Sequence, residues 1–159
     1  MRPGCQELRS ATAQSPIRYT PPMEKSIKLI ILKGEGGSSE TIAAEEISEN
    51  TFKVIENPVF NCRISFGTIV KVTENAEKEM VVSKVVRASD YKTKHFLLSS
   101  ISNIAEFKIK IGNPIIEAGG FWELVMGGML YVNLPRESTF NIDEIFRSNN
   151  LFPTEIVEK

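Results

Sequence analysis

The chain has 159 residues, 42% of them hydrophobic and 25% charged, which is the composition of an ordinary globular protein large enough to bury a core. Nineteen basic and twenty acidic side chains give a formal net charge of −1, so the sequence lacks the basic surface of a dedicated duplex-binding protein. Two cysteines are too few for a disulfide framework and no apolar run approaches the roughly 18 residues that span a bilayer, which together predict a cytoplasmic protein.

The first 22 residues predict a disordered N-terminal extension. They contain several prolines and few large apolar groups, and they show neither a strand nor a helix period. Met23 follows, and we expect the native protein to start there, with a functional tail as the alternative. Residues 23–159 are predicted to form a single domain, with possible halves at 23–79 and 80–152.

The first half of this domain predicts antiparallel strands. Residues 27–32 (IKLIIL) predict the first strand, while 41–48 (TIAAEEIS) leave helix and strand open because alanine and glutamate favour a helix but the segment is short. The alternating segment before Pro58 predicts another strand. Residues 64–72 (ISFGTIVKV) predict the clearest strand, in which Gly67 indicates a bulge or a close approach of two backbones.

The second half predicts strands interrupted by helices. In chain order we expect strands at 80–88 and 93–100 around a turn at 89–92, a helix at 101–113, two strands within 114–135 and a helix at 140–150. Isoleucines recur at helical spacing in the first helix, and Gly112 with Asn113 is expected to cap its C-terminus. The two strands after it are expected to break at Gly119-Gly120.

This order of elements predicts an α+β fold. The strands of the first half are expected to form a mostly antiparallel bent sheet or half-barrel. From about residue 80 the order becomes β-β-α-β-β-α, which indicates a ferredoxin-like or split-sheet half. Because strands and helices do not alternate regularly, a doubly wound parallel sheet is disfavoured.

Three stretches of the sequence resemble a bacterial family, the domain-of-unknown-function family 4265. They are "ETIAAEEISENTFKVIENPVFNCRISFGTIVKV" from residue 40, "EMVVSKVVRASDYKTKHFLL" from residue 79 and "GGMLYVNLP" from residue 127. Gly67 in a strand, the pair Ser89 and Thr93, and Pro135 at the close of a later strand match the family's pattern. The resemblance covers about residues 40–150 and implies a compact α+β domain of a small bacterial protein, without an established reaction.

The most basic part of the chain is "SKVVRASDYKTKH" (83–95), which also holds a tyrosine. If the strands on either side of its turn pair as a hairpin, several of its side chains share a face and can contact an acidic partner or a phosphate backbone. Residues 24–50 are acidic by contrast, and a solvated surface is the alternative interpretation of this charge pattern. The residues predicted to bind here are Lys84, Arg87, Tyr91, Lys92, Lys94 and His95.

The sequence predicts no catalytic residue and no metal ligands. His95 is the one histidine of the chain, and no serine, cysteine or carboxylate is spaced to pair with it. Cys62 is expected to be a small buried hydrophobe, because its neighbour Arg63 would point to the other face of a strand. Trp122 is either an anchor for a partner or, as we favour, a core residue. Glu123 beside it is expected to be a partly buried carboxylate, and both residues complete the predicted binding set.

Two classes of function fit these observations. The first is a non-enzymatic protein-interaction module, such as an adaptor or an immunity-like neutraliser, with a protein partner and without a nucleic-acid or membrane target. The second is a small enzyme or ligand-binding domain whose pocket is built from dispersed residues. A pocket lined by Tyr91, His95 and Glu123 would favour the second class, and a flat charged face with an exposed aromatic would favour the first. Neither class requires a cofactor.

Overall fold

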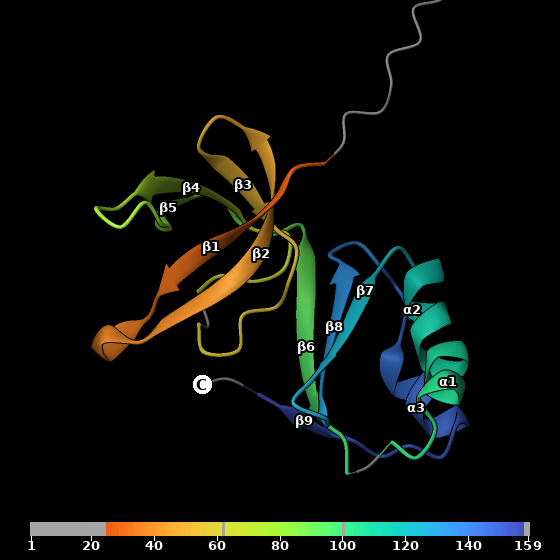
Figure 1. Cartoon of the computed structure of the whole chain (residues 1–159). Helices are drawn as coiled ribbons and strands as arrows, with labels where there is room; N and C mark the ends of the chain where they lie inside the picture. The colour runs from red at the N-terminus through yellow and green to blue at the C-terminus, as the bar shows by residue number, and fades with distance from the viewer. Residues whose placement is uncertain (1–24, 62, 100, 158–159) are drawn as a thin grey trace, which may run out of the picture.

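The computed structural model describes residues 25–61, 63–99 and 101–157 (Figure 1). The predicted N-terminal extension, the expected start at Met23 and the expected burial of Cys62 lie outside the described residues. The described chain forms a five-stranded barrel followed by a four-stranded sheet with helices on one face. No helix in these ranges is long and apolar enough to cross a membrane.

The first five strands form a closed barrel. In chain order they are β1 (Ile27–Lys33), β2 (Ser39–Ser48), β3 (Thr51–Val54), β4 (Ile69–Glu74) and β5 (Met80–Arg87), with a 3-10 turn, η1 (Glu35–Gly37), between the first two. Each strand pairs antiparallel with the next, and a parallel bridge between Ile31 and Val81 joins β5 to β1. The expected bent sheet is therefore closed on itself.

Residues 41–48, for which the sequence left helix and strand open, lie in strand β2 of the barrel. Ile42 and Ala44 are buried between more exposed neighbours, and β2 pairs with β1 along most of its length. Strand pairing and burial outweigh the helix propensity of alanine and glutamate, because the apolar side chains repeat at every second residue. The core of the barrel consists of Ile30, Leu32, Ile42, Ala44, Phe52, Val54, Ile64, Val70 and Val72.

The strand predicted over residues 64–72 is shorter than expected. β4 begins at Ile69, and the residues before it form turns and loop. Gly67 has a φ of +85°, which an L side chain rarely adopts, and a Cβ there would lie 2.8 Å from Ser89 Oγ and 3.0 Å from the Tyr91 ring. The close approach at Gly67 is therefore made to the side chains of Ser89 and Tyr91 and not to a second backbone, and Gly67 lies before the strand.

The second half forms an antiparallel sheet in the order β7-β8-β6-β9. Its strands are β6 (Tyr91–Leu97), β7 (Phe121–Val125), β8 (Met129–Pro135) and β9 (Thr154–Ile156). A helical segment connects β6 to β7, and α3 (Ile142–Ser148) connects β8 to β9. This β-α-β-β-α-β sequence is that of ferredoxin-like units, and the α+β fold class is confirmed.

The predicted β-β-α-β-β-α frame is displaced by one strand. β5, which was counted as the first strand of this half, belongs to the barrel, since it pairs with β4 while β6 pairs with β8 and β9. β9 escapes prediction because its three residues are all exposed and show no alternation. The final helix α3 is confirmed, and the side chain of its N-cap, Asn141, accepts a hydrogen bond from the Asp143 N–H.

The helix between β6 and β7 contains a widened turn. It runs from α1 (Ile104–Phe107) through a π-helical turn, η2 (Lys108–Gly112), into α2 (Asn113–Glu117). Inside an α-helix, the ring of Pro114 would press on the carbonyl of Lys110 and leave it without a donor. The π-helical turn immediately before Pro114 lets the helix continue through it.

Two boundaries predicted in this region are wrong. Gly112 does not end the helix: its φ is −64°, and a Cβ there would lie 2.6 Å from the Trp122 ring, so glycine supplies space instead of a left-handed cap. The two strands break at residues 126–128, where Met126 and Gly127 have positive φ, while Gly119-Gly120 precedes the first of them.

The helices cover one face of the sheet (Figure 1). The core between the helices and the sheet consists of Phe96, Leu98, Phe107, Ile111, Ile115, Leu130, Val132, Leu134, Ile142 and Phe146. Trp122 packs against this core, with its ring centroid 5.6 Å from that of Phe107. The opposite face of the sheet carries Phe121 and Glu123, which contact the barrel.

Candidate functional site

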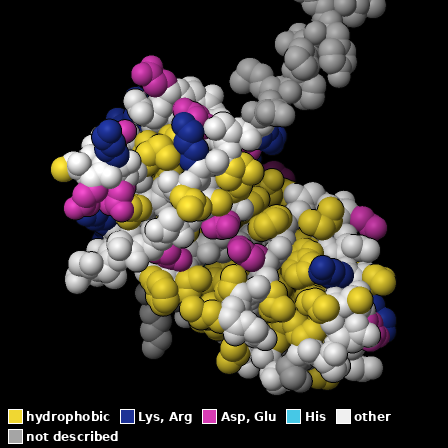
Figure 2. Space-filling model, viewed as in Figure 1, with side chains coloured by type: hydrophobic (Ala, Val, Ile, Leu, Met, Phe, Trp, Pro, Cys, Tyr) yellow, Lys and Arg dark blue, Asp and Glu magenta, His cyan; other side chains and the backbone are white. Residues whose placement is uncertain are grey.

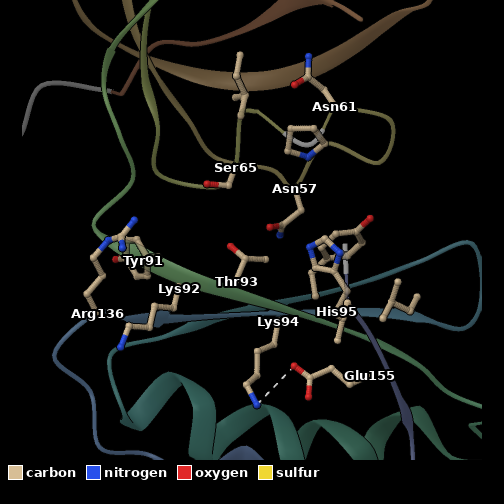
Figure 3. A pocket seen from close by; sticks show the side chains of 15 residues that line it. Asn57, Asn61, Ser65, Tyr91, Lys92, Thr93, Lys94, His95, Arg136 and Glu155 are labelled. Atoms are coloured by element: carbon tan, nitrogen blue, oxygen red, sulfur yellow. Dashed lines mark ion pairs between the residues drawn. The ribbon is translucent and has the colours of Figure 1, made fainter. Parts of the chain in front are cut away.

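A polar cleft of about 460 Å³ lies between the barrel and the sheet (Figure 3). One wall is the loop between β3 and β4, and the other is formed by β6, β8 and β9. Clefts of this size accommodate a small molecule or a few residues of an extended chain. The lining residues are Asn57, Pro58, Asn61, Ile64, Ser65, Tyr91, Lys92, Thr93, Lys94, His95, Tyr131, Arg136, Glu155, Ile156 and Val157.

Asn57 projects from the barrel loop into the middle of this cleft (Figure 3). The residue is 4% exposed, and both its backbone N–H and its side-chain Nδ2 donate to Glu123 Oε2, each at 3.0 Å. Its Oδ1 is buried and has no hydrogen-bond partner. Because Glu123 binds the amide nitrogen, the side chain is fixed with its acceptor oxygen unpaired, which is uncommon for a buried polar atom.

Two cations, Lys92 and Arg136, line one end of the cleft. In Figure 3 both lie near the Tyr91 end of β6: Lys92 projects from the strand on the same side as Lys94, and Arg136 lies beside Tyr91, where its Nε donates to the Ser89 carbonyl at 3.0 Å. Neither cation forms an ion pair with a carboxylate of the described chain. Lys94 differs, since its Nζ lies 3.4 Å from Asp143 and 3.6 Å from Glu155. The charge of Lys92 and Arg136 is therefore not neutralised locally.

The other end of the cleft is aromatic and aliphatic. The rings of His95 and Tyr131 lie 4.3 Å apart between centroids, and the Tyr131 hydroxyl lies 3.1 Å from Met129 Sδ. The apolar side chains that line the cleft are Pro58, Ile64, Ile156 and Val157. The cleft thus combines a cationic end, a central polar group and apolar walls.

Hydrogen bonds and aromatic contacts hold the two walls together. Ser89 Oγ donates to the Phe66 carbonyl at 2.5 Å and accepts from the Tyr91 N–H at 3.0 Å. The Phe66 ring stacks on Phe121 with centroids 4.6 Å apart and meets Tyr91 edge-on at 5.0 Å. On the floor of the cleft, Thr93 Oγ1 donates to Asn133 Oδ1 at 2.7 Å. These contacts fix the shape of the cleft before a ligand arrives.

The structure brings together part of the predicted binding set. Tyr91, Lys92, Lys94 and His95 line the cleft, and Glu123 stands behind it as the partner of Asn57. Lys84 and Arg87 do not join them, because β5 and β6 belong to different sheets and form no hairpin. Trp122 lies on the helix-facing side of β7, as the core interpretation expected.

The charge pattern of the sequence does not persist on the barrel surface. The acidic Glu45 and Glu46 of β2 pair with Lys25 and Lys28 on or next to the neighbouring strand, at 3.2 and 2.7 Å. Figure 2 shows acidic and basic side chains interspersed over the barrel, while hydrophobic side chains gather over the half with the sheet and helices. This arrangement fits the interpretation of the acidic stretch as a solvated surface.

Sequence reasoning missed Asn57 and Arg136. Asn57 lies directly before Pro58, where the alternating pattern of the preceding segment ends, and Arg136 follows the last residue of a strand without any periodic pattern. Their partners, Glu123 and Ser89, are 66 and 47 positions away in the sequence. No local signal marks such pairs, because they form through the docking of the barrel on the sheet.

The cleft is not a metal centre of the usual kind. Across the described ranges, no three His, Cys, Asp or Glu side chains come together as metal ligands. What the arrangement offers chemically is charge, polar side chains and a shaped cavity, which are the elements of ligand recognition.

A solved structure of similar fold extends over almost the whole described chain. It is described as "Novel crystal structure of a hypothetical protein from Neisseria gonorrhoeae", with a TM-score of 0.54 and 16% sequence identity, and the match covers 86% of this chain and 95% of that chain. At this identity the likeness shows the fold alone. No curated protein matches the sequence.

A family model matches residues 40–148, from β2 through α3. Its description is Domain of unknown function (DUF4265), the family that the sequence resembled. Positions that carried the resemblance meet at the junction of barrel and sheet, where Gly67 approaches Ser89 and Thr93 lines the cleft. The chain belongs to the DUF4265 family.

Proposed function

We propose that this protein is a binding module whose cleft holds an anionic ligand. The observation that carries the proposal is the pair Lys92 and Arg136, two cations at one end of a polar cleft without an ion-pair partner in the described chain. Most of the other cations in this region are paired, Lys94 with two carboxylates and Arg87 with Asp90 at 3.1 Å.

Arg136 is suited to this role by its geometry. Its Nε is engaged by the Ser89 carbonyl, which orients the planar group and leaves the remaining N–H donors for a ligand. Hydrogen bonds between charged groups are stronger than neutral ones, so a carboxylate or phosphate gains more here than an uncharged molecule.

The proposal takes the ligand-binding alternative of the second class, in place of the protein-interaction module favoured from the sequence, because the contact that it invokes is a cleft. Tyr91 and His95 line that cleft, and Glu123 orients Asn57 from behind, which supports a ligand pocket more than a flat interaction face. The residues that line the cleft come from segments far apart in the sequence: the β3–β4 loop, β6, β8 and β9. This separation explains why no sequence motif marks the site.

Ligand titration of the full chain tests this proposal. A panel of small carboxylates and phosphates is titrated into isotope-labelled protein, and the amide shifts of Asn57, Thr93 and their neighbours are followed. We expect at least one anion to bind there, and the double variant Lys92→Gln/Arg136→Gln to weaken it by at least about tenfold, the factor that loss of one charged hydrogen bond brings.

A matched control separates the cleft from general charge. Lys71→Gln/Lys84→Gln removes the same two charges from facing positions on exposed barrel strands. This variant is expected to bind as the wild type does. Equal weakening by both double variants, or no cleft shift with any anion, would reject the proposal.

A further inference from the structure

We propose that the anionic ligand of the cleft is an extended acidic segment of a partner protein, which pairs as a strand with the free edge of β6. The inference rests on the proposed anion binding and names the class of ligand, and it joins the cleft to the protein partner expected from the sequence. It is carried by the course of the cleft, which follows the edge of β6 beyond the end of β9.

The lining of the cleft shows that it follows a strand edge. Five consecutive residues of β6, 91–95, line it, although successive side chains of a strand point to opposite faces of the sheet. In Figure 3, Lys92 and Lys94 project on one side of the strand and Thr93 on the other, towards the barrel loop. A single cavity touches both sets of side chains only if it passes around the edge of the strand, where it also reaches the backbone.

This edge of β6 is unpaired before His95. β9 pairs with β6 from Leu97 to His95, where its last partner is Ile156. No other strand of the described ranges pairs with β6 on this side, since β8 occupies the opposite one. Residues 91–94 therefore form an open strand edge in line with β9, and extended peptides add to such edges by main-chain hydrogen bonds.

Thr93 directs its backbone groups to the open edge. In an antiparallel sheet, alternate residues of a strand direct their N–H and carbonyl to the same neighbour. The Asp90 carbonyl and the Leu98 N–H, at the two ends of β6, bond to residues at the two ends of β8, so the even-numbered positions of β6 face β8. Tyr91 and Thr93 face the other side. The Tyr91 N–H already donates to Ser89 Oγ, which leaves Thr93 to offer both a donor and an acceptor.

Charge complementarity indicates that the pairing segment is acidic. A residue opposite Lys92 on an added strand places its side chain on the same face of the sheet as Lys92, which has no ion-pair partner in the described chain. Arg136 lies beside Tyr91 at the end of the open edge (Figure 3). Lys94 is already paired with two carboxylates, so an added acidic side chain gains most near the Tyr91 end.

The other face of the added strand is expected to be apolar. Its alternate side chains would lie between β6 and the barrel loop, where Pro58 and Ile64 line the cleft. The partner segment is therefore expected to alternate acidic and apolar residues, with the acidic ones on the side of Lys92.

Two peptides that differ in charge test the acidic requirement on the full chain. Acetyl-Glu-Val-Glu-Val-Glu-amide is capped, so that no chain end contributes, and its glutamines-for-glutamates analogue is the uncharged control. We expect the glutamate peptide to bind in the cleft and the glutamine peptide to bind at least about tenfold more weakly, because its hydrogen bonds to Lys92 and Arg136 lose one of their two charges. The measurement is the dissociation constant from the amide shifts of Thr93 and its neighbours.

N-methylation of the glutamate peptide tests the strand pairing. In an antiparallel strand whose glutamates lie on the side of Lys92, the valine amides face β6 and the glutamate amides face away. Methylating both valine amides should weaken binding by at least about tenfold, since the hydrogen bonds to Thr93 are lost. Methylating the last two glutamate amides is the matched control and should leave the affinity within about twofold. The reversed pattern would mean a parallel strand on the same edge, and equal affinity of the two methylated peptides would overturn the pairing.

Hydrogen exchange of the Thr93 amide gives an independent readout. Saturation with the glutamate peptide should slow this exchange by at least about tenfold, because the Thr93 N–H gains a partner. The amides of Lys92 and Lys94 face β8 in both states and serve as internal controls. An anion held by side chains alone would leave the exchange of Thr93 unchanged, and this result would also overturn the pairing.

The results separate this inference from the proposed function. If small anions bind in the cleft while the glutamate peptide does not, or if methylated and unmethylated peptides bind alike through Lys92 and Arg136, strand pairing is wrong and anion binding stands. If neither the peptide nor any small anion binds, both proposals fail. Sedimentation of the free chain as a dimer that the peptide dissociates would assign the open edge to a second copy and overturn the acidic partner.

Discussion

Gly67 joins the barrel to the sheet at the scale of a single residue. Its φ is +85°, and a Cβ would lie 2.8 Å from Ser89 Oγ and 3.0 Å from the Tyr91 ring. The positive φ strains any residue with a side chain, and the neighbouring atoms leave no space for a Cβ. Position 67 therefore requires glycine for two reasons, backbone strain and steric clash, and a glycine elsewhere that has only the first can separate them.

We predict that Gly67→Ala destabilises the protein by about 2–4 kcal/mol, from left-handed strain of about 1 kcal/mol and the steric clash with Ser89 and Tyr91. Chemical denaturation of the full chain measures this. Gly127→Ala is the control, because Gly127 has a φ of +74° but nothing within 4 Å of its Cβ position. The free energy of unfolding of Gly127→Ala should fall by about 1 kcal/mol, because this variant has the backbone strain without the clash. Similar losses in the two variants would contradict the close approach.

Single residues also show what sequence reasoning can find at a site. Gly67 was identified because a glycine inside an apolar run weakens a strand and so marks a bend or a close backbone approach. Lys92 and His95 were identified because charge clusters locally in the sequence. Asn57 and Arg136 were not, since their roles depend on Glu123 and Ser89, which reach them through tertiary contacts. A role created by such a contact leaves no trace in the residues around it.

At the scale of elements, the packing of the helix on β7 depends on Gly112. A Cβ at this position would lie 2.6 Å from the Trp122 ring, which is itself held edge-on by Phe107. The helix approaches the strand closely here, in the widened turn before Pro114. The ring cannot move away without leaving its own core contacts.

Gly112→Ala is therefore expected to lower the unfolding free energy by about 1–3 kcal/mol, although alanine is the better helix former. A double-mutant cycle with Trp122→Leu tests the cause by denaturant unfolding. Gly112→Ala should be nearly neutral in the Trp122→Leu background, because the ring that it clashes with is gone. An equal loss in both backgrounds would show that the helix, and not the contact with Trp122, is affected.

Element boundaries explain which parts of the fold the sequence predicts. α3 has a capping asparagine and a periodic apolar face, and β1 and β5 have apolar runs, so each was predicted close to its position. The assignment of β5 to the barrel and β6 to the sheet depends on pairing between distant strands, which alternation does not encode. Residues 114–117 were expected to begin a strand because Gly112 with Asn113 was interpreted as the C-terminal cap of the helix. The helix instead continues through Gly112 and Pro114 by way of the π-helical turn.

At the scale of the whole molecule, the barrel and the sheet have separate cores. The two clusters of buried apolar residues share no member, and the junction between them is made of a few specific contacts. The main aromatic contact across it is Phe66, which stacks on Phe121 and meets Tyr91 edge-on. The cleft lies at this junction, so ligand affinity and coupling of the two halves depend on the same geometry.

We predict that Phe66→Ala uncouples the two halves during unfolding. Each half keeps its own core, so loss of the stacked ring weakens their mutual stabilisation more than it damages either interior. Calorimetry of the wild type should give one transition, as expected of a single domain, and of Phe66→Ala two, or one markedly broadened. Phe152→Ala is the control, because its ring is 80% exposed and its loss should leave the transition unchanged.

Hydrogen exchange locates the uncoupling. The slowest amides of β2 and β8 should open with the same free energy in the wild type and with different free energies in Phe66→Ala, because each half then opens alone. One sharp transition with equal loss in both strands would mean that the polar contacts suffice, namely Asn57 with Glu123 and the Ser89 hydroxyl with the barrel backbone. In that case ligand binding would raise the opening free energy of both halves equally. If Phe66→Ala does uncouple the halves, a ligand that contacts both walls of the cleft should restore a common opening free energy.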